Sequence, residues 1–338
     1  MSAALPDSPP RAPRLAVDYV GVEALDAALA RADTLAVFAF GDAAPDRADP
    51  RFLRVPLLPL GAPALEVWRG AGPVATASDD GVAHAEDGEL QFGALQLHGG
   101  DAEDMLAAGE RAYARAAAFW RRSGYPHLLR IWNYFDRITD GEGDEERYRR
   151  FCIGRVRGLG AVDTAALPAA TAIGAPGEAR VLQVYWLAAR RPGTPLENPR
   201  QTSAWRYPRQ YGPQSPSFAR ALLPPSPSLP LFVSGTASIV GHVSRHAGSL
   251  DSQLDETLAN LDSLLAAARE RRPGLPPRLD ASARLKAYVH DPAHAARIET
   301  RLRERLGEAV PLLLLHGDVC RRELQVEIEG MHGVIMDA

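Results

Sequence analysis

Residues 198–220 gather side chains that could bind an anion. The segment contains four arginines and three large aromatic residues: Arg200, Arg206, Arg209, Arg220, Trp205, Tyr207 and Tyr211. Its prolines and Gly212 exclude a long helix or a central strand, which predicts an ordered surface loop. Guanidinium groups beside tyrosine hydroxyls suit a bound carboxylate or phosphate. A rigid loop held by aromatic packing, with solvated arginines, is the alternative interpretation.

A second candidate lies near the C-terminus, where residues 322–329 alternate as a strand does. One side carries Leu324, Val326 and Ile328, and the other carries Glu323, Gln325, Glu327 and Glu329. The carboxylates could be the solvated face of a half-buried sheet. Alternatively, one glutamate lies in a cleft, where a raised pKa would make it a general acid.

Two other segments could contribute to a site. A helix over 145–159 would place Tyr148, Phe151 and Arg155 on one face. Arg155 then either extends its guanidinium into water or binds a buried anion. The small-residue turn at 234–238 contains Gly235, which would let a ligand approach the backbone closely. It lacks the lysine and the glycine spacing of a phosphate loop.

Composition limits the class of protein. The 338 residues are long enough for two domains, and 46% hydrophobic with 24% charged residues is typical of a soluble globular protein. A net charge of -4 does not favour a nucleic-acid or membrane-surface binder. Cys152 and Cys320 are the only cysteines, which predicts a reducing cytoplasm and small core residues without zinc or disulfide chemistry. His242 and His246 lack a third ligand at a set spacing, so no metal site is predicted.

The hydrophobic pattern predicts two similar halves. Strands are expected at 14–22, 34–40, 65–67, 91–97, 127–135, 180–189, 231–233, 284–289 and 322–329, and helices at 101–123, 145–159, 251–271 and 292–306. Residues 168–176 are expected to be a loop. Strand, helix, strand, helix, strand therefore occurs twice, which predicts an internal duplication. The expected division is a disordered tail at 1–13, an N-terminal half at 14–175 and a C-terminal half at 176–338.

The motifs resemble the chorismatase family. The similarity lies in Asn198-Pro-Arg-Gln, in Trp205-Arg-Tyr-Pro-Arg-Gln-Tyr-Gly-Pro, in Val233-Ser-Gly-Thr-Ala-Ser-Ile-Val-Gly-His, and in residues 130–138 and 147–155. The second half also resembles the small trimeric YjgF/RidA-type domain. This resemblance implies an α+β fold of mixed sheets with helices on one face, in a duplicated, chorismate-mutase-like architecture. The assembly would be a monomer or trimer-like.

The resemblance implies an enzyme that cleaves chorismate without a cofactor or metal, releasing pyruvate and 3-hydroxybenzoate, with 4-hydroxybenzoate as a second product in one branch. Chorismate carries two carboxylates, which implies two clamps. The sequence offers Arg155 with Tyr148, and Arg209 with Tyr207 or Tyr211. The general acid that protonates the enolpyruvyl methylene would be Glu327, with Glu329 as the second choice.

Two positions indicate which branch of the family this chain is similar to. Gly235 and Cys320 match the glycine and cysteine of 3-hydroxybenzoate synthases, where hydrolases carry alanine and valine. One alternative is a chorismate hydrolase that gives a dihydroxycyclohexadiene carboxylate. The other is a RidA-type protein that binds small carboxylates or deaminates imines. The expected partner is the small molecule chorismate, with neither nucleic acid nor membrane.

Overall fold

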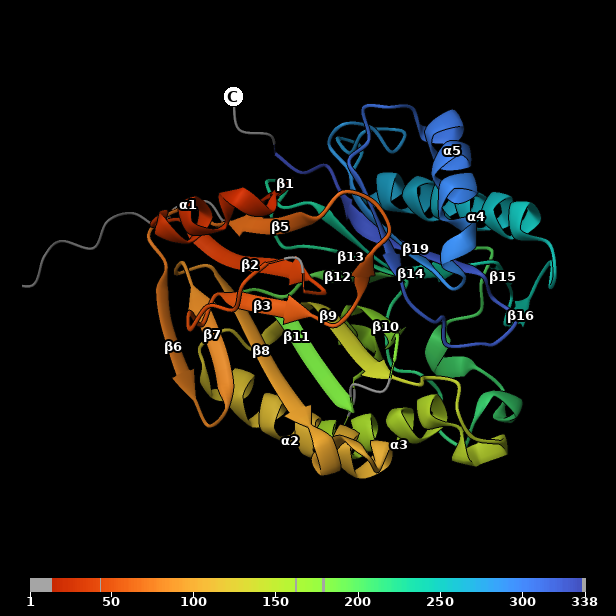
Figure 1. Ribbon diagram of the computed structural model, residues 1–338, viewed down its shortest axis with the longest axis horizontal. Coiled ribbons are helices and arrows are strands. Elements are labelled where there is room, and N and C mark those ends of the chain that lie inside the picture. The colour runs from red at the N-terminus through yellow and green to blue at the C-terminus, as the bar shows by residue number, and fades with distance from the viewer. Residues whose placement is uncertain (1–13, 43, 162, 178–179, 336–338) are drawn as a thin grey trace, which may run out of the picture.

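The computed structural model describes residues 14–42, 44–161, 163–177 and 180–335. The tail predicted at 1–13 lies outside these residues. Three large mixed sheets face one another, and the helices cover their outer sides (Figure 1). The predicted α+β class with mixed sheets is therefore confirmed. Among the described residues, no helix is long and apolar enough to cross a membrane.

The three large sheets have four, six and seven strands, and in each the strands lie side by side in the following order. The four-stranded sheet contains β1 (Ala16–Gly21), β5 (Ala64–Arg69), β2 (Thr34–Phe40) and β3 (Phe52–Val55). The six-stranded sheet contains β10 (Ala169–Ala175), β9 (His127–Asp136), β11 (Val181–Ala189), β8 (Leu90–His98), β7 (Val82–Glu86) and β6 (Ala75–Asp79). The seven-stranded sheet contains β12 (Thr194–Leu196), β13 (Ala221–Leu223), β14 (Leu231–Ala237), β19 (Val326–His332), β17 (Arg284–Val289), β18 (Leu312–His316) and β4 (Leu58–Pro59).

A small ribbon and five α-helices lie outside these three sheets in the described part of the chain. The ribbon pairs β15 (Ile239–Val240) with β16 (Val243–Ser244). The helices are α1 (Leu25–Ala30), α2 (Met105–Arg122), α3 (Arg147–Leu159), α4 (Leu250–Arg271) and α5 (Ala295–Leu306). Asp104 caps α2, because its carboxylate accepts hydrogen bonds from the backbone N–H groups of Leu106 and Ala107.

The same strand order occurs in all three large sheets, so the predicted twofold repeat is part of a threefold one. The six-stranded sheet runs β10-β9-β11-β8, and the seven-stranded sheet runs β18-β17-β19-β14. In both, the first pair is parallel and the others are antiparallel. The helices α2 and α3 occupy the same chain positions as α4 and α5. The four-stranded sheet repeats this order as β3-β2-β5-β1, with α1 between β1 and β2. The boundary predicted at residue 176 falls between β10 and β11, which belong to one sheet.

The inner faces of the three sheets share one hydrophobic core. It contains Phe38 and Trp68 from the first sheet, Trp132 and Tyr185 from the second, and Phe232 from the third. The rings of Trp132 and Tyr185 stack with centroids 4.8 Å apart. Because helices cover the outer faces, strands such as β11 and β19 are buried on both sides. A polar side chain on an inner face therefore lies in the interior.

Residues 169–175 form strand β10, so the loop predicted at 168–176 is wrong. The strand pairs in parallel with β9. Its alanines and glycine gave little strand signal in the sequence. Small side chains also let β10 lie against β14 of the other sheet, and the backbone N–H of Ala170 donates to Ser234 Oγ at 2.9 Å. This contact between sheets forms one wall of the site.

Candidate active site

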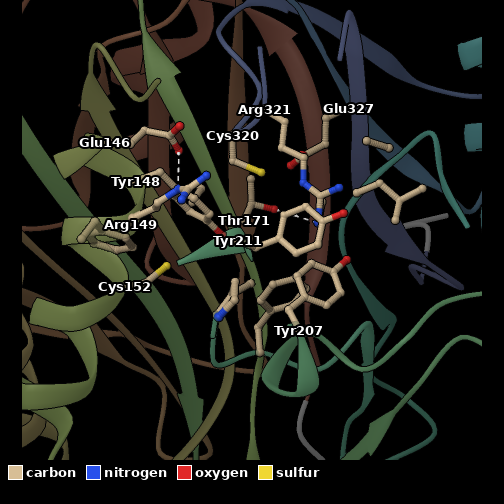
Figure 2. A pocket seen from close by; sticks show the side chains of 18 of the residues that line it. Glu146, Tyr148, Arg149, Cys152, Thr171, Tyr207, Tyr211, Cys320, Arg321 and Glu327 are labelled. Atoms are coloured by element: carbon tan, nitrogen blue, oxygen red, sulfur yellow. Dashed lines mark hydrogen bonds and ion pairs between the residues drawn. The ribbon is translucent and has the colours of Figure 1, made fainter. Parts of the chain in front are cut away.

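A cavity of about 380 Å³ lies where the six-stranded sheet meets the seven-stranded sheet. Side chains of α3, β10, β14 and β19 line it, together with the loop that precedes β13. Small-molecule sites in proteins have volumes of roughly 300–1,000 Å³. Figure 2 shows Glu327 and Cys152 on opposite sides of this pocket, with tyrosine rings between them. The cavity therefore suits a ligand the size of a substituted six-membered ring.

Glu327 reaches the pocket from the inner face of β19. The residue is only 6% exposed, so the interpretation of a solvated sheet face is wrong for it and for Glu329. The pKa of Glu327 is raised to about 8, first by burial and next by the negative charge of Glu329, while Arg130 and Arg220 lower it. At neutral pH this carboxyl group therefore carries its proton and can donate it.

Gly235 makes room for this carboxyl group. The pairing of β14 with β19 is irregular between Val233 and Thr236, which is typical of a bulge. A Cβ atom on Gly235 would overlap Glu327 Oε1. The backbone N–H of Gly235 donates to Thr171 Oγ1 of β10 at 3.1 Å. Only glycine allows this close approach, and the segment predicted as a turn is part of strand β14.

Two buried arginines face the pocket. Arg155 on α3 is 5% exposed and Arg220 is 3% exposed. Within the described part of the chain, the Nε atoms of both lack a hydrogen-bond partner. Arg220 donates to the hydroxyl of Tyr207 at 2.7 Å and to a backbone carbonyl. Buried guanidinium groups with free donors suit carboxylate ligands.

Arg209 occupies a different place from the one the sequence suggested. It is absent from the pocket lining, its side chain is 65% exposed, and it forms an ion pair with Asp144 at 2.5 Å. Tyr207 and Tyr211 do line the pocket. The guanidinium of Arg321 lies 4.0 Å from the ring centroid of Tyr211, which holds this aromatic wall against the loop before β19.

Tyr148, Cys152 and Cys320 line the remaining wall of the pocket. Burial raises the pKa of Cys320 to about 12, with a smaller contribution from Glu327. Burial likewise raises the pKa of Cys152 to about 12 and that of Tyr148 well above its usual value. All three groups are thus neutral at physiological pH and contribute shape more than charge. In the described part of the chain, no cluster of His, Cys, Asp and Glu is arranged to hold a metal ion.

Seven of the eight predicted site residues line the pocket, and Arg209 is the exception. Arg220 was noted among the arginines of residues 198–220 but was not chosen as a site residue, and Thr171 was missed. Arg220 shares the 198–220 segment with Arg209, and residue type alone could not tell which arginine turns inward. The apolar residues that follow Arg220 could have indicated its burial, because Arg220 directly precedes β13 and is buried with it. Thr171 was missed because β10 was not predicted.

Comparisons with known proteins agree with this geometry. A family model for the N-terminal region of FkbO/Hyg5-like chorismatases matches residues 66–188. A chorismatase of Streptomyces rapamycinicus is 38% identical over 276 residues, which cover 79% of this chain and 81% of that protein. A 3-hydroxybenzoate synthase of Streptomyces hygroscopicus is 34% identical over 284 residues, covering 81% of this chain and 82% of that protein. A chorismatase crystal structure superposes with a TM-score of 0.83 at 31% identity, covering 95% of this chain and 98% of that one. The chain belongs to the chorismatase family.

Proposed function

We propose that this protein cleaves chorismate into 3-hydroxybenzoate and pyruvate, with Glu327 as the general acid. The observation that carries the proposal is a buried carboxyl group with a pKa of about 8, set in a pocket with two buried arginines. A substrate with two carboxylates would pair with these arginines. The relatives named chorismatase and 3-hydroxybenzoate synthase support the substrate and the product.

The arginines would orient the substrate around Glu327. Arg220 lies close enough to lower the pKa of Glu327, so we assign it to the carboxylate of the enolpyruvyl group. Arg155, beside Tyr148 on α3, would then hold the ring carboxylate. Buried charge pairs of this kind fix position as well as affinity. Arg220 therefore takes the role that the sequence analysis gave to Arg209, whose guanidinium forms an ion pair with Asp144 at the surface.

The reaction would begin with transfer of the Glu327 proton to the enolpyruvyl methylene carbon. The ether carbon becomes electron-deficient, the bond between the ether oxygen and the ring breaks, and pyruvate leaves. The hydroxyl oxygen on the neighbouring ring carbon then bonds to the carbon that has lost pyruvate, giving an epoxide, and its proton returns to the Glu327 carboxylate. The bond from this oxygen to its original carbon breaks, the proton on the carbon that now carries the oxygen moves to the oxygen, and the ring becomes aromatic. Chorismate then gives 3-hydroxybenzoate and pyruvate with no net uptake of water, whereas the dihydrodiol requires one water molecule.

Pocket shape supports the route without water. Gly235 and Cys320 both line the cavity beside Glu327. Because Gly235 has no side chain, the Glu327 carboxyl group can occupy the space beside it. The buried Cys320 thiol lines the pocket next to this carboxyl group. We infer that these two residues keep the ring hydroxyl near the reacting carbon and exclude an attacking water.

Product identification tests the proposal. Purified protein is incubated with chorismate in metal-free buffer, and the products are separated by chromatography with mass detection. We expect 3-hydroxybenzoate and pyruvate in equal amounts, with any 4-hydroxybenzoate as a minor product. A dihydrodiol as the main product would contradict the product assignment. Unconsumed chorismate would contradict the proposed function and favour a RidA-type role.

We also propose that the chain acts as a monomer. The four-stranded sheet repeats the strand order of the other two and contributes to the same core, so one chain supplies all three sheets. A second chain is not needed to complete the core or the pocket. Sedimentation equilibrium should give a mass near 36.4 kDa. A stable trimer would contradict this proposal.

A further inference from the structure

A line of buried charged side chains runs beneath the pocket and joins all three sheets. Glu66 on β5, Lys286 on β17, Glu329 on β19 and Arg130 on β9 are each at most 3% exposed. Lys286 Nζ lies 2.8 Å from Glu66 Oε2 and 3.0 Å from Glu329 Oε1. The other carboxylate oxygen of Glu329 accepts a hydrogen bond from Arg130. We call these four residues the charge cluster.

Stability alone does not explain the charge cluster. Buried ion pairs are often no more stabilising than apolar residues of the same size, because desolvation offsets their attraction. The surroundings are aromatic, and the indole N–H groups of Trp68 and Trp132 donate to Glu66 and Glu329 at 2.8 and 2.7 Å. Four charges in such a core suggest a role beyond packing.

Thr171 connects the charge cluster to the pocket. Its hydroxyl donates to Glu329 and accepts hydrogen bonds from Arg130, at 2.6 Å, and from the Gly235 backbone. Thr171 and Gly235 both line the cavity. The cluster therefore ends directly behind Glu327, which is two residues from Glu329 on the same face of β19.

The charges of the cluster balance before Glu327 is counted. Glu66 and Glu329 are negative, and Lys286 and Arg130 are positive. We propose that Glu329 is a positioning residue whose fixed negative charge, held in place by Lys286, Arg130 and Glu66, keeps the proton on Glu327 until the substrate takes it. This inference rests on the proposed cleavage of chorismate with Glu327 as the acid.

The electrostatics of each group agree with this arrangement. Burial alone would raise the pKa of Glu329, but Lys286 and Arg130, with hydrogen bonds from Thr171 and Trp132, hold this pKa below its usual value. Burial would lower the pKa of Lys286, but Glu66 and Glu329 raise it well above its usual value. The titratable groups that face Glu327 from the surrounding elements are Glu329, Arg130, Arg220, Tyr148, Cys320 and Tyr288. Raised pKa values keep the last three neutral, so Glu329 is the negative charge of this set.

The test is the pH dependence of kcat/KM for chorismate. In the wild type, the rate should fall as pH rises through about 8, where Glu327 loses its proton. Glu329→Gln should move this fall to lower pH by about one unit or more, because a neighbouring negative charge is lost. Lys286→Met removes a positive charge and should move the fall to higher pH. Glu66→Gln leaves the charge cluster with one net positive charge and should move the fall to lower pH.

The double variant Glu66→Gln/Lys286→Met restores the charge balance and serves as the control for disrupted packing. It should return the fall in rate toward the wild-type pH, although both side chains differ. Thermal unfolding identifies which variants are folded. If Glu329→Gln does not fold, the pH profiles of Glu66→Gln and of the double variant test the inference in its place. Profiles that coincide with the wild type in folded variants would overturn the inference.

A second readout separates this inference from the proposed function. Carboxyl 13C NMR of the same variants reports the ionisation of Glu327 without turnover. If chorismate is not consumed but the Glu327 titration moves to lower pH in Glu66→Gln and to higher pH in Lys286→Met, the inference stands and the proposed function fails. If chorismate is consumed and the titration does not move, the inference fails alone.

Discussion

The six-stranded and seven-stranded sheets share one strand order but differ at their central strands. Gln183 on β11 lies opposite Tyr134, just as Glu327 on β19 lies opposite Tyr288. Gln183 is buried and donates to a backbone carbonyl at 2.8 Å. The register of β8 against β11 is regular, whereas β14 bulges against β19 beside Gly235.

The difference shows how a repeated frame acquires one site. Both strands place a polar side chain on the inner face, so the fold alone does not determine chemistry. Of these two strands, only β19 combines a carboxyl group with a bulge that makes room for it, next to two buried arginines. A buried amide in the other repeat is neutral at every pH, whereas a buried acid can carry or release a proton.

The largest expected effect is on turnover. Glu327→Gln should lower kcat by about 10²–10⁴-fold, because the amide cannot donate a proton to carbon. The matched change Gln183→Met, at the equivalent position of the other sheet, should leave kcat within about threefold, provided that the protein folds. Stopped assays with product quantification measure both variants. Near-normal turnover by Glu327→Gln would place the acid elsewhere.

The effect of replacing an arginine of residues 198–220 on KM should depend on how deeply that arginine is buried. Arg220→Ala should raise KM by about 30-fold or more, because one partner of a buried charge pair is lost. Arg209→Ala, an exposed arginine from the same segment, should change KM by about threefold at most. Steady-state kinetics with chorismate compares the two variants. Equal effects would mean that Arg209 also contacts the substrate.

The bulge can be tested at Gly235. Gly235→Ala places a Cβ atom against Glu327 Oε1, so the carboxyl group must move. A displacement of this kind should lower kcat by about 10²-fold and increase the share of dihydrodiol. Gly274→Ala is the control, because no atom lies within 4 Å of its added Cβ. An unchanged rate and product ratio would show that the pocket adapts to the side chain.

Substitutions at the equivalent positions of the two sheets should change the pH dependence of stability in opposite directions. The pKa of Glu327 is raised from 4.5 to about 8 on folding, so the protonated acid is favoured in the fold and stability is lost as pH rises between these values. Glu327→Gln should therefore gain stability over the wild type, by about 1.4 kcal/mol per pH unit in this window. Gln183→Glu should lose stability over a similar window. Urea unfolding at pH 5 and pH 8 measures the free energy of unfolding of both variants and of the wild type. The same change between the two pH values in all three proteins would contradict the account.

Local sequence patterns predicted most of the strands and helices that carry the site, but not how deeply their polar side chains are buried. The apolar alternation of β19 and the face of α3 were visible in the sequence. Whether the other face of β19 meets water depends on a second sheet, which alternation within one strand cannot reveal. Arg209 and Arg220 are eleven residues apart and look equivalent until the loop is folded. Glu66 and Lys286 meet across 220 residues of chain, a contact that no spacing rule indicates.

The most direct test is the ionisation of Glu327 itself. Protein labelled with 13C at glutamate carboxyl carbons is titrated from pH 5 to pH 10 beside the Glu327→Gln variant. We predict one carboxyl resonance that titrates near pH 8 in the wild type and is absent from the variant. Its protonated form at pH 7 would support Glu327 as the proton donor. A Glu327 resonance that is fully ionised at pH 7 would contradict the account.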